Sequence, residues 1–383
     1  MKSRILQSQL ENDLFKKDVV ILYGTRRVGK TTLVKQIIEN QTKKGRKCAY
    51  FNCELMRIRS RVETTDDQAL YDFFGGYDLV VLDEAQSIDK IGLTLKIMND
   101  TFPNIQVIAT GSSSFDIANK TGEPLVGRSR TFVLHQFSLQ EIYNDTNDII
   151  KLDANIENFM RFGLYPGVVE KVEREAIKAI KNITNSYLYK DILKIDGMKN
   201  SSILLALLKL LALQIGSEVS YNEIANRLGI SIPTVAKYID LLEKCFVLFV
   251  LPAFSRNIRN EIGLKSRKIY FYDLGIRNAI INNFSDFSSR SDIGALWENF
   301  CIVELIKKAQ YHEIFFNNYF WRNYNQQEVD YIEEHSGTIY AYEFKYNPKA
   351  KVNIPKSFVE TYGASIKLIN RENFYKELLN LEK

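Results

Sequence analysis

The chain has 383 residues, 45% of them hydrophobic, and a formal net charge of +5. This length predicts two to three domains, and the hydrophobic content is ample for folded cores. The weak positive charge permits contact with DNA through a local patch but does not require it. No apolar stretch reaches the roughly 20 residues that a membrane span needs, so a membrane is not expected as a partner.

The cysteines also limit the class of protein. Cys48, Cys53, Cys245 and Cys301 show no Cys-x2-Cys spacing, and the chain has only three histidines. This pattern indicates neither a zinc knuckle nor a disulfide framework. Reduced core cysteines in a cytoplasmic protein are therefore expected.

A glycine-rich motif at residues 24–32 follows a predicted buried strand at residues 18–23 and precedes a predicted helix. Its pattern is Gly-x4-Gly-Lys-Thr. Gly24 and Gly29 permit positive φ and close approach of the backbone, so that N–H groups can point at an anion. The motif predicts binding of ATP or GTP. Its candidate binding residues are Gly24, Thr25, Arg26, Arg27, Val28, Gly29, Lys30, Thr31 and Thr32.

Two side chains of this motif carry the expected chemistry. The Lys30 ammonium is expected to reach the β and γ oxygens of the nucleotide, and the Thr31 hydroxyl is expected to be a ligand of Mg²⁺. For Arg26 and Arg27, a solvated loop face is favoured over phosphate contact. Thr32 is expected to pack at the N-terminus of the helix.

Residues 78–84, with the sequence Asp-Leu-Val-Val-Leu-Asp-Glu, predict the second half of the nucleotide site. The four apolar residues indicate a strand that is buried on both faces, as in a parallel sheet. Phosphoryl transfer needs a carboxylate for the metal and a group that acts on the attacking water. Asp83 is therefore expected to bind Mg²⁺, and Glu84 to orient or deprotonate the water. An Asp-Glu helix cap is the alternative.

Further along the chain, a predicted strand at residues 105–109 ends in a turn where Thr110 or Ser112 is a candidate sensor of the γ-phosphate. A turn without function is the alternative. Arg128 or Arg130 is a candidate arginine finger, acting in its own subunit or in a neighbour. Action in a neighbour would require a homo-oligomer, and a plain surface charge is the alternative.

Because they carry these motifs, residues 15–145 resemble the ATPase core of the AAA superfamily. The chain resembles in particular a prokaryotic group in which this core precedes a C-terminal domain of unknown function. The resemblance implies ATP rather than GTP as the nucleotide. It rests on residues 24–31, 82–86, 110–112 and 127–128.

After the core, a helical lid is expected at residues 137–200. Residues 220–243 then read as a helix, a Gly-containing turn and a second amphipathic helix, which is the helix-turn-helix pattern. Apolar runs at residues 246–250 and 268–272 are expected to be the strands of a wing.

This winged-helix module is a candidate DNA-binding element. Five basic residues lie between its strands beside a single acid, and this excess favours contact with phosphates. The second helix is less basic, because Asp240 and Glu243 lie beside its lysines. DNA contact and a packing module that relays the nucleotide state therefore both remain open. The five basic residues are Arg256, Arg259, Lys265, Arg267 and Lys268.

A second constellation of charged residues lies in the last hundred residues. Glu298 is on a predicted helix, Asp330 at the end of a predicted strand, and Glu343 on the hairpin partner of that strand. Asp330 and Glu343 are expected to hold one Mg²⁺, with Glu298 completing a site of oxygen ligands. Lys345 projects from the same strand face as Glu343, where it is expected to position water or steady the phosphate.

These residues resemble the PD-(D/E)xK restriction-endonuclease-like superfamily, particularly its junction-resolvase-type members, although Val329 replaces the proline of the motif. The resemblance implies a nuclease-like domain in which Glu298, Asp330, Glu343 and Lys345 are catalytic. A chance match or a catalytically inactive relative is the alternative.

The sequence thus predicts an α/β protein with four parts. They are a P-loop NTPase with a parallel sheet at residues 1–136, a helical lid at 137–200, a winged helix-turn-helix at 201–275 and a small α/β restriction-endonuclease-like domain at 276–383. The expected function is an ATPase that is coupled to Mg²⁺-dependent action on DNA. The alternative is an ATP-dependent signalling or scaffolding switch with an inactive C-terminal binding domain.

Overall fold

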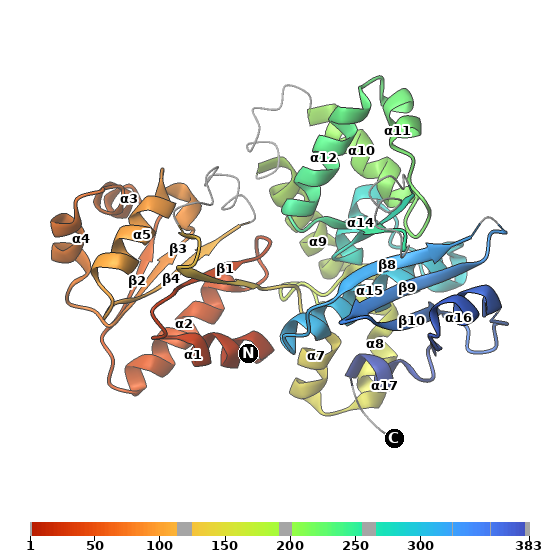
Figure 1. The fold of residues 1–383 in the computed structure, drawn as a ribbon, viewed down its shortest axis with the longest axis horizontal. Coiled ribbons are helices and arrows are strands. Elements are labelled where there is room, and N and C mark those ends of the chain that lie inside the picture. Colours follow the sequence, from red (N-terminus) through yellow and green to blue (C-terminus); the bar gives the residue numbers. More distant parts are fainter. Residues whose placement is uncertain are drawn as a thin grey trace. The chain divides into compact units, whose positions relative to one another are not determined.

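A computed structural model describes residues 2–112, 125–190, 201–254, 266–323, 325–352 and 354–379. The chain forms two compact units, whose elements are labelled in Figure 1. Met1–Gln136 make up most of the first unit. The second unit comprises Phe137–Ser186, Met198–Glu243 and Val247–Lys383.

The first unit is built on a five-stranded parallel sheet with the strand order β2-β3-β4-β1-β5. Because the strands are parallel, their carboxyl ends meet at one edge of the sheet. The expected α/β fold with a parallel sheet is confirmed. The strands are β1 Val19–Tyr23, β2 Cys48–Asn52, β3 Leu79–Asp83, β4 Gln106–Gly111 and β5 Ser129–Val133. The helices are α1 Ile5–Asp13, α2 Lys30–Lys43, α3 Met56–Val62, α4 Asp67–Phe74, η1 Ala85–Ser87 and α5 Ile91–Thr101.

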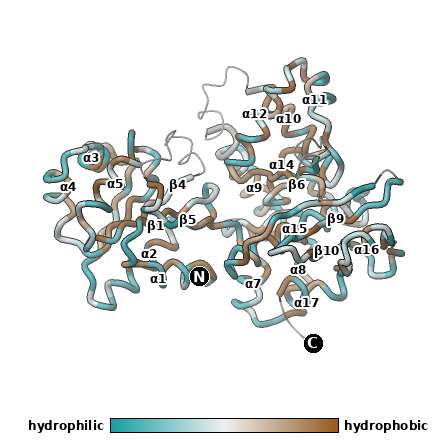
Figure 2. Tube along the Cα trace, viewed as in Figure 1, coloured by the Kyte–Doolittle hydropathy of each residue, from teal (hydrophilic) through white to brown (hydrophobic). Residues whose placement is uncertain are grey.

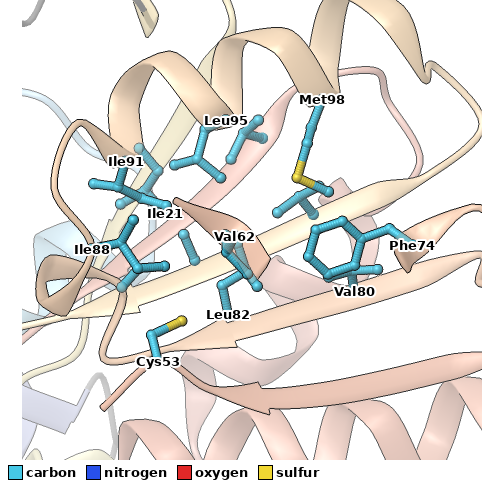
Figure 3. Packing of buried hydrophobic residues seen from close by; sticks show 14 of the residues in the cluster. Ile21, Cys53, Val62, Phe74, Val80, Leu82, Ile88, Ile91, Leu95 and Met98 are labelled. Atoms are coloured by element: carbon cyan, nitrogen blue, oxygen red, sulfur yellow. The ribbon is translucent and has the colours of Figure 1, made fainter. Parts of the chain in front are cut away.

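The core of the first unit explains the apolar runs in its sequence. Strands β1 and β3 are buried along their whole length, as expected for the middle of a parallel sheet. Figure 3 shows one face of this core, where Ile21, Val80 and Leu82 lie in one cluster with Leu95 and Met98 of α5. This packing places the ends of β1 and β3 rigidly at the edge that carries the expected nucleotide site.

The second unit contains a mixed four-stranded sheet with the order β11-β10-β9-β8 and a two-stranded antiparallel sheet of β6 and β7. Strand β10 is antiparallel to β9 and parallel to β11. The strands are β6 Leu248–Pro252, β7 Arg267–Phe271, β8 Asn317–Arg322, β9 Glu328–His335, β10 Thr338–Phe344 and β11 Ile366–Ile369. The helices are α7 Leu139–Thr146, α8 Ile149–Phe162, α9 Glu173–Lys190, α10 Ser201–Leu213, α11 Tyr221–Leu228, α12 Ile232–Lys244, α14 Leu274–Ile281, η4 Phe287–Ser289, α15 Ile293–Tyr311, α16 Lys356–Tyr362 and α17 Phe374–Leu379.

Helices α11 and α12 occupy the segment where the sequence predicts a helix-turn-helix. Ser220 caps α11 by accepting a hydrogen bond from the backbone N–H of Glu223. Gly229 ends α11 in the left-handed conformation, which a glycine adopts without steric cost. Ile224 and Val235 are buried and contribute to the expected apolar seam.

The pair of strands expected to form a wing is present as β6 and β7. Lys268 on β7 was expected to add to a basic patch, but its side chain is buried and pairs with carboxylates, so it is not available to DNA. Arg267 lies over the ring of Tyr221, 4.2 Å from its centroid. The other three basic residues of the expected patch, Arg256, Arg259 and Lys265, lie outside the described residues.

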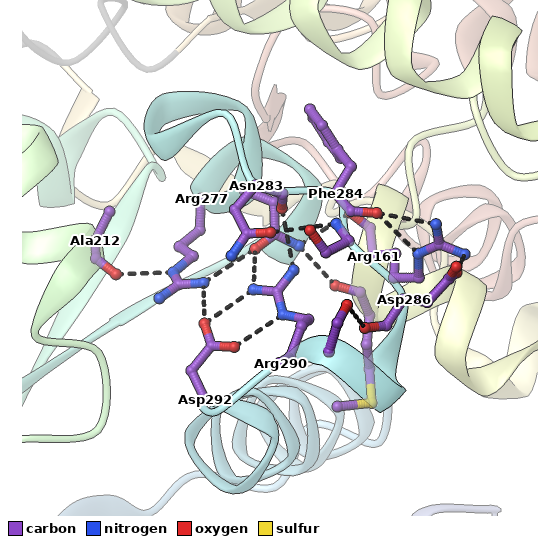
Figure 4. A network of polar contacts seen from close by, with 12 residues as sticks. Arg161, Ala212, Arg277, Asn283, Phe284, Asp286, Arg290 and Asp292 are labelled. Atoms are coloured by element: carbon purple, nitrogen blue, oxygen red, sulfur yellow. Dashed lines mark hydrogen bonds and ion pairs between the residues drawn. The ribbon is translucent and has the colours of Figure 1, made fainter.

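The three regions expected after residue 136 pack into this single unit. Asn278 of α14 donates hydrogen bonds to the carbonyl oxygens of Met160 and Arg161 at the end of α8, at 3.0 and 2.9 Å. Arg277, also on α14, donates to the carbonyl oxygen of Ala212 on α10. Figure 4 shows the contact between Arg277 and Ala212 within a network of polar contacts between elements that are far apart in the sequence. The expected boundaries after residues 200 and 275 therefore do not separate compact units.

Helix α10 is apolar around most of its surface, and Figure 2 draws it mainly in brown. Leu204, Leu207, Leu208 and Leu211 are buried, which makes α10 a core helix of the second unit. Among the described residues, no helix is long and apolar enough to cross a membrane. All four cysteines lie in the described part of the chain and are free thiols, as their spacing predicts.

Candidate nucleotide and carboxylate sites

Two glycines shape the loop between β1 and α2. Gly29 has a φ of 103° and caps the N-terminus of α2, and Gly24 has a φ of 150°. A Cβ added to Gly24 would lie 2.3 Å from the carbonyl oxygen of Leu134. A side chain is therefore excluded at Gly24 by contact and disfavoured at Gly29 by conformation. The result is a tight loop at a helix N-terminus, which is the geometry that binds phosphate.

Lys30 is the first residue of α2, and only 4% of its surface is exposed. Its Nζ donates hydrogen bonds to the carbonyl oxygens of Gly24 at 2.6 Å and Thr25 at 3.2 Å. A buried ammonium needs such acceptors. The charge of Lys30 is thus held within the loop, where phosphate oxygens could share or replace these carbonyl partners.

The remaining residues of the loop divide into buried and exposed ones. Thr25 and Val28 are buried, and Arg26 is half-buried. Arg27 is exposed and has a φ of 65°, in agreement with the solvated loop face favoured for it. Thr32 is also exposed, so the prediction that it packs at the start of the helix is wrong.

The carboxylate of Asp83 lies where three strands end. The Thr31 hydroxyl donates to Oδ2 of Asp83 at 2.8 Å, and the Tyr50 hydroxyl donates to the same oxygen at 2.5 Å. The Thr110 hydroxyl donates to Oδ1. Two of the residues that the sequence singles out, Thr31 and Asp83, are therefore in direct contact. Thr110 contacts Asp83 instead of pointing freely toward a γ-phosphate.

Tyr50 on β2 is a residue of this site that the sequence motifs do not mark. Tyr50 is paired with Val81 on β3, which lies two residues before Asp83. Partial burial raises the pKa of the Tyr50 hydroxyl, and the nearby negative charge of Asp83 raises it further. The hydroxyl therefore stays protonated and remains a donor to Asp83. Only the pairing of β2 with β3 reveals this role.

Glu84 follows β3 in the left-handed conformation, with φ 55° and ψ 43°. This conformation is uncommon for a residue with a side chain, and it turns the chain sharply after the strand. The Glu84 carboxylate accepts a hydrogen bond of 2.5 Å from Nε2 of Gln86, and its backbone N–H donates to the Thr110 hydroxyl at 3.2 Å. The acid is thus held in a defined position beside Asp83.

Arg128 lies at the opposite end of the sheet from the phosphate loop. Its carbonyl oxygen accepts a hydrogen bond from the N–H of Val19 at the start of β1, whereas the loop begins after Tyr23 at the other end. The strand between them spans roughly 15 Å. The Arg128 guanidinium pairs with Asp100 at 2.7 Å, and Arg130 also pairs with acids near this end. The prediction of a finger in its own subunit is wrong for Arg128. Action on a neighbouring subunit stays a prediction.

The carboxylates of the second unit meet on the hairpin of β9 and β10. Tyr331 is paired with Tyr342, so the antiparallel register places Asp330 opposite Glu343. The backbone N–H of Phe344 donates to Oδ2 of Asp330 at 2.9 Å. The structure thus brings together the two carboxylates that were expected to share a metal ion.

Lys345 lies beside both of these carboxylates. Its Nζ is 2.9 Å from Oε2 of Glu343 and 3.6 Å from Oδ2 of Asp330. Burial raises the pKa of Glu343 to about 7, and the negative charge of Asp330 adds to this shift. Burial would lower the pKa of Lys345, but the charge of Asp330 and the hydrogen bond to Glu343 raise it. The cluster therefore keeps a charged ammonium next to carboxylates that repel each other.

Glu298 on α15 has other partners than the expected metal. Lys268 donates to its Oε1 at 3.0 Å, and the Tyr270 hydroxyl donates to the same oxygen at 2.5 Å. Burial raises the pKa of Glu298 to about 7. Lys268 also pairs with Glu328. The residues that the structure describes contain no group of three or more Asp, Glu, His or Cys side chains placed to hold a metal ion. Glu298 is nevertheless close enough to Asp330 for the negative charge of that residue to raise the pKa of Glu298 further. Its part in a metal site stays a prediction.

One family model matches most of the first unit. Residues 16–143 match the family model described as an AAA domain. The matched residues include the phosphate loop, the end of β3 and all of β5, and the match agrees with the resemblance seen in the sequence motifs. Residues 153–286 and 293–377 match two further models that are described only as domains of unknown function. Neither description names a nuclease or a winged helix.

The relatives of the chain are uncharacterized proteins. One from Methanocaldococcus jannaschii is 28% identical over 306 residues, which cover 71% of this chain and 63% of the relative. The chain thus spans less than two thirds of the length of that relative. One from Mycobacterium tuberculosis is 24% identical over 349 residues, which cover 90% of this chain and 74% of the relative.

Two solved structures show a distant likeness. AMPPCP-bound DnaA from Aquifex aeolicus has 17% identity and a TM-score of 0.31, over 62% of this chain and 86% of its own. Cdc6p from Pyrobaculum aerophilum has 13% identity and a TM-score of 0.33, over 73% of this chain and 94% of its own. Both likenesses are too distant to bear on function.

Proposed function

We propose that the first unit binds ATP together with Mg²⁺ and hydrolyses it. The observation that carries this proposal is the hydrogen bond of 2.8 Å between the Thr31 hydroxyl and the Asp83 carboxylate. Thr31 follows β1 and Asp83 ends β3, and these two strands are separated in the sheet by β4. The contact thus joins two motifs that are 52 residues apart. The match of residues 16–143 to an AAA domain supports ATP as the nucleotide.

The residues at this position fit a magnesium ion. Mg²⁺ takes oxygen ligands and keeps several waters, and Thr31 and Asp83 present a hydroxyl and a carboxylate side by side. A bound ion would neutralise negative charge on the phosphates. Lys30 would bind the β and γ oxygens, and Glu84 would orient or deprotonate the attacking water.

Titration calorimetry with MgATP tests this function. Lys30→Ala is expected to weaken binding roughly 100-fold, because it removes a charged donor whose contacts contribute about 3 kcal/mol. Lys43→Ala is the matched control, since Lys43 is an exposed lysine on the same helix that pairs only with Glu39 among its described contacts. If the wild-type protein has no measurable affinity for MgATP, or if Lys30→Ala binds as well as wild type, the proposal fails.

A homo-oligomer is also proposed. Arg128 cannot reach the phosphate loop of its own subunit, so an arginine finger at this position requires a second copy of the chain. Sedimentation velocity with and without AMP-PNP and Mg²⁺ tests this. We expect assembly with nucleotide, and we expect Arg128→Ala to lower ATP turnover without weakening nucleotide binding. The proposal of a homo-oligomer would be contradicted if the protein stayed monomeric with nucleotide and Arg128→Ala hydrolysed ATP as fast as wild type.

A second candidate function is Mg²⁺-dependent cleavage of DNA by the second unit. It is favoured by the convergence of Asp330, Glu343 and Lys345 at the hairpin of β9 and β10. Two carboxylates are the kind of oxygen ligand that Mg²⁺ prefers, and a neighbouring ammonium suits a developing phosphate charge. Glu298, whose carboxylate accepts hydrogen bonds from Lys268 and Tyr270, is proposed as a third acid near Asp330.

Nicking of supercoiled and branched DNA in the presence of Mg²⁺ or Mn²⁺ tests this second function. Asp330→Ala and Lys345→Ala are expected to abolish cleavage, and Lys349→Ala, which changes an exposed lysine nearby, is expected to leave it intact. If wild type binds DNA without cleaving it, the second unit is better described as an inactive binding domain of an ATP-dependent switch.

A further inference from the structure

The segment Leu134–Leu139 connects the two compact units, and in the first unit it lies against the phosphate loop. The N–H of Leu134 donates to the carbonyl oxygen of Tyr23 at 2.8 Å. Arg4 donates from one nitrogen to the carbonyl oxygen of Val28 in the loop, at 3.0 Å, and from the other to that of His135, at 2.5 Å. Arg4 therefore holds both the phosphate loop and the beginning of the segment.

Gln136 is the last residue of the first unit and has an incomplete set of hydrogen bonds. Only 2% of its surface is exposed. Its Nε2 lies 3.4 Å from the hydroxyl of Thr25 in the phosphate loop, which is a long hydrogen bond. Its Oε1 is buried and has no hydrogen-bond partner among the described residues. A buried carboxamide oxygen without a partner costs free energy, so a change in its surroundings that supplies a hydrogen-bond donor would stabilise this side chain.

An occupied phosphate loop would supply such a partner. Thr25 lies between Gly24 and Lys30, whose backbone and ammonium are expected to surround the phosphates. A half-turn of the Gln136 amide would let Oε1 accept from the Thr25 hydroxyl and would turn the two Nε2 donors toward a bound anion or its waters. Gln136 is thus placed to respond to occupancy of the loop.

In the second unit, two of the next three residues, Phe137 and Leu139, are hydrogen-bonded to helix α15. The carbonyl oxygen of Phe137 accepts a hydrogen bond from Nζ of Lys307 at 2.9 Å. The N–H of Leu139 donates to Oε2 of Glu304 at 2.7 Å. Lys307 and Glu304 also pair with each other at 2.8 Å, and both side chains are almost completely buried. A single peptide bond therefore separates Gln136 from Phe137, whose carbonyl oxygen is held by Lys307 of α15.

We propose that Gln136 is a positioning residue of the nucleotide site and that Leu134–Leu139 transmit occupancy of the phosphate loop to α15. The inference rests on the proposed binding of ATP. Helix α15 also carries Glu298, six residues before Glu304, so the hydrogen bonds of this segment to Glu304 and Lys307 connect it to the helix that holds one of the acids of the second unit.

Hydrogen exchange of the backbone amides of α15, measured with and without AMP-PNP and Mg²⁺ on the full chain, tests the proposal. In wild type we expect nucleotide to change exchange rates in α15 at least twofold. Gln136→Met keeps the volume and removes the polar atoms, so at a concentration of AMP-PNP that saturates the variant it is expected to lose the change in α15. Gln136→Glu, which keeps the shape, is expected to lose it as well.

Gln140→Met is the matched control, because Gln140 is four residues further along and its amide contacts only Asn144 among its described contacts. It should behave as wild type does. Retention of the full nucleotide effect in both Gln136 variants would overturn the proposal, as would wild-type binding of AMP-PNP without any change in α15. Failure of wild type to bind AMP-PNP would instead refute the proposed function itself, and the coupling with it.

Discussion

Tyr50 and Asp83 are joined by a hydrogen bond of 2.5 Å between the tyrosine hydroxyl and Oδ2 of the carboxylate. The same oxygen accepts from Thr31, so Tyr50 restrains the group that is expected to bind Mg²⁺. Hydrogen bonds to a charged acceptor are among the stronger ones in proteins, and Asp83 is buried. The position of Asp83 therefore depends on a residue of β2 that belongs to neither sequence motif.

Replacement of Tyr50 by phenylalanine tests this role. We expect Tyr50→Phe to lower the free energy of unfolding by about 1–2 kcal/mol, because one donor to a buried carboxylate is lost. We also expect weaker binding of MgATP, measured by calorimetry, with little change for ATP in the presence of EDTA. Tyr77→Phe alters a more exposed tyrosine of the same unit and should do neither. Equal effects of the two variants would rule out a specific role for Tyr50.

Glu84→Gln is expected to separate binding from hydrolysis. The amide keeps the size of the side chain and can still contact Gln86, but it cannot take a proton from water. Turnover should fall by about 100-fold or more, which is the usual range for loss of a general base, while MgATP binding is retained. Phosphate release and calorimetry on the same preparation measure the two quantities. Normal turnover would show that another group acts on the water.

Gly24→Ala should abolish nucleotide binding, because its Cβ would lie 2.3 Å from the carbonyl oxygen of Leu134. The loop or the chain after β5 would have to move, at a cost of at least about 2 kcal/mol in stability. Gly45→Ala is the matched control. Gly45 also has a positive φ, of 85°, but an added Cβ there meets nothing within 4 Å. Gly45→Ala should lower the stability only by the backbone strain of a side chain at positive φ, about 1–2 kcal/mol, and should leave nucleotide binding intact. Thermal unfolding and calorimetry distinguish the two.

The nucleotide site shows which parts of a site the sequence can predict. Thr31 and Asp83 were expected to meet because each belongs to a motif whose spacing is fixed by its own chemistry. The role of Tyr50 could not be predicted, since it depends on which strand lies next to β3. The placement of Arg128 likewise depends on the direction of β5 beside β1, which its local sequence does not encode.

The carboxylate cluster of the second unit was likewise predicted only in part. The hairpin of β9 and β10 was predicted, and its register follows from the alternation of the two strands. Lys268 was interpreted as part of a basic surface because it lies in a run of basic residues. Its position two residues before Tyr270 places both on one face of β7, where they meet Glu298. That alternation was the only signal of the contact in the sequence.

Asp273 is expected to give the second unit a pH-dependent stability. Burial raises its pKa from 3.8 to about 6, although its carboxylate accepts hydrogen bonds from the N–H groups of Leu164 and Ile276. Because the folded protein holds this proton more tightly than the unfolded chain, the contribution of Asp273 to stability is lost as the pH rises from about 4 to about 6.

Asp273→Asn should remove this dependence. Urea unfolding between pH 4 and pH 6 should show a flatter profile for the variant than for wild type, with the largest difference on the order of 3 kcal/mol. The variant should also be less stable at pH 4, because the asparagine retains only one acceptor oxygen for two backbone donors. Asp286→Asn, at an exposed acid of the same unit, is the control. Parallel profiles for wild type and Asp273→Asn would contradict the assignment.

Lys268 should contribute strongly to the stability of the second unit. Only 2% of its side chain is exposed, and it pairs with both Glu298 and Glu328. Burial would lower the pKa of Lys268, but these carboxylates raise it well above its usual value, so the ammonium stays charged. Lys268→Met would leave Glu298 without its counter-ion and Glu328 with only Arg322, at 3.6 Å, and we expect a loss of about 3–5 kcal/mol in the free energy of unfolding.

A double-mutant cycle separates this electrostatic role from packing. Glu298→Gln in the Lys268→Met background removes one of the uncompensated charges, so the double variant should be more stable than the sum of the two single losses predicts. Lys349→Met, at an exposed lysine of the same unit, should change stability by less than about 0.5 kcal/mol. Additive losses in the cycle would mean that Lys268 acts by filling space, and that the charge of Glu298 is balanced by other groups.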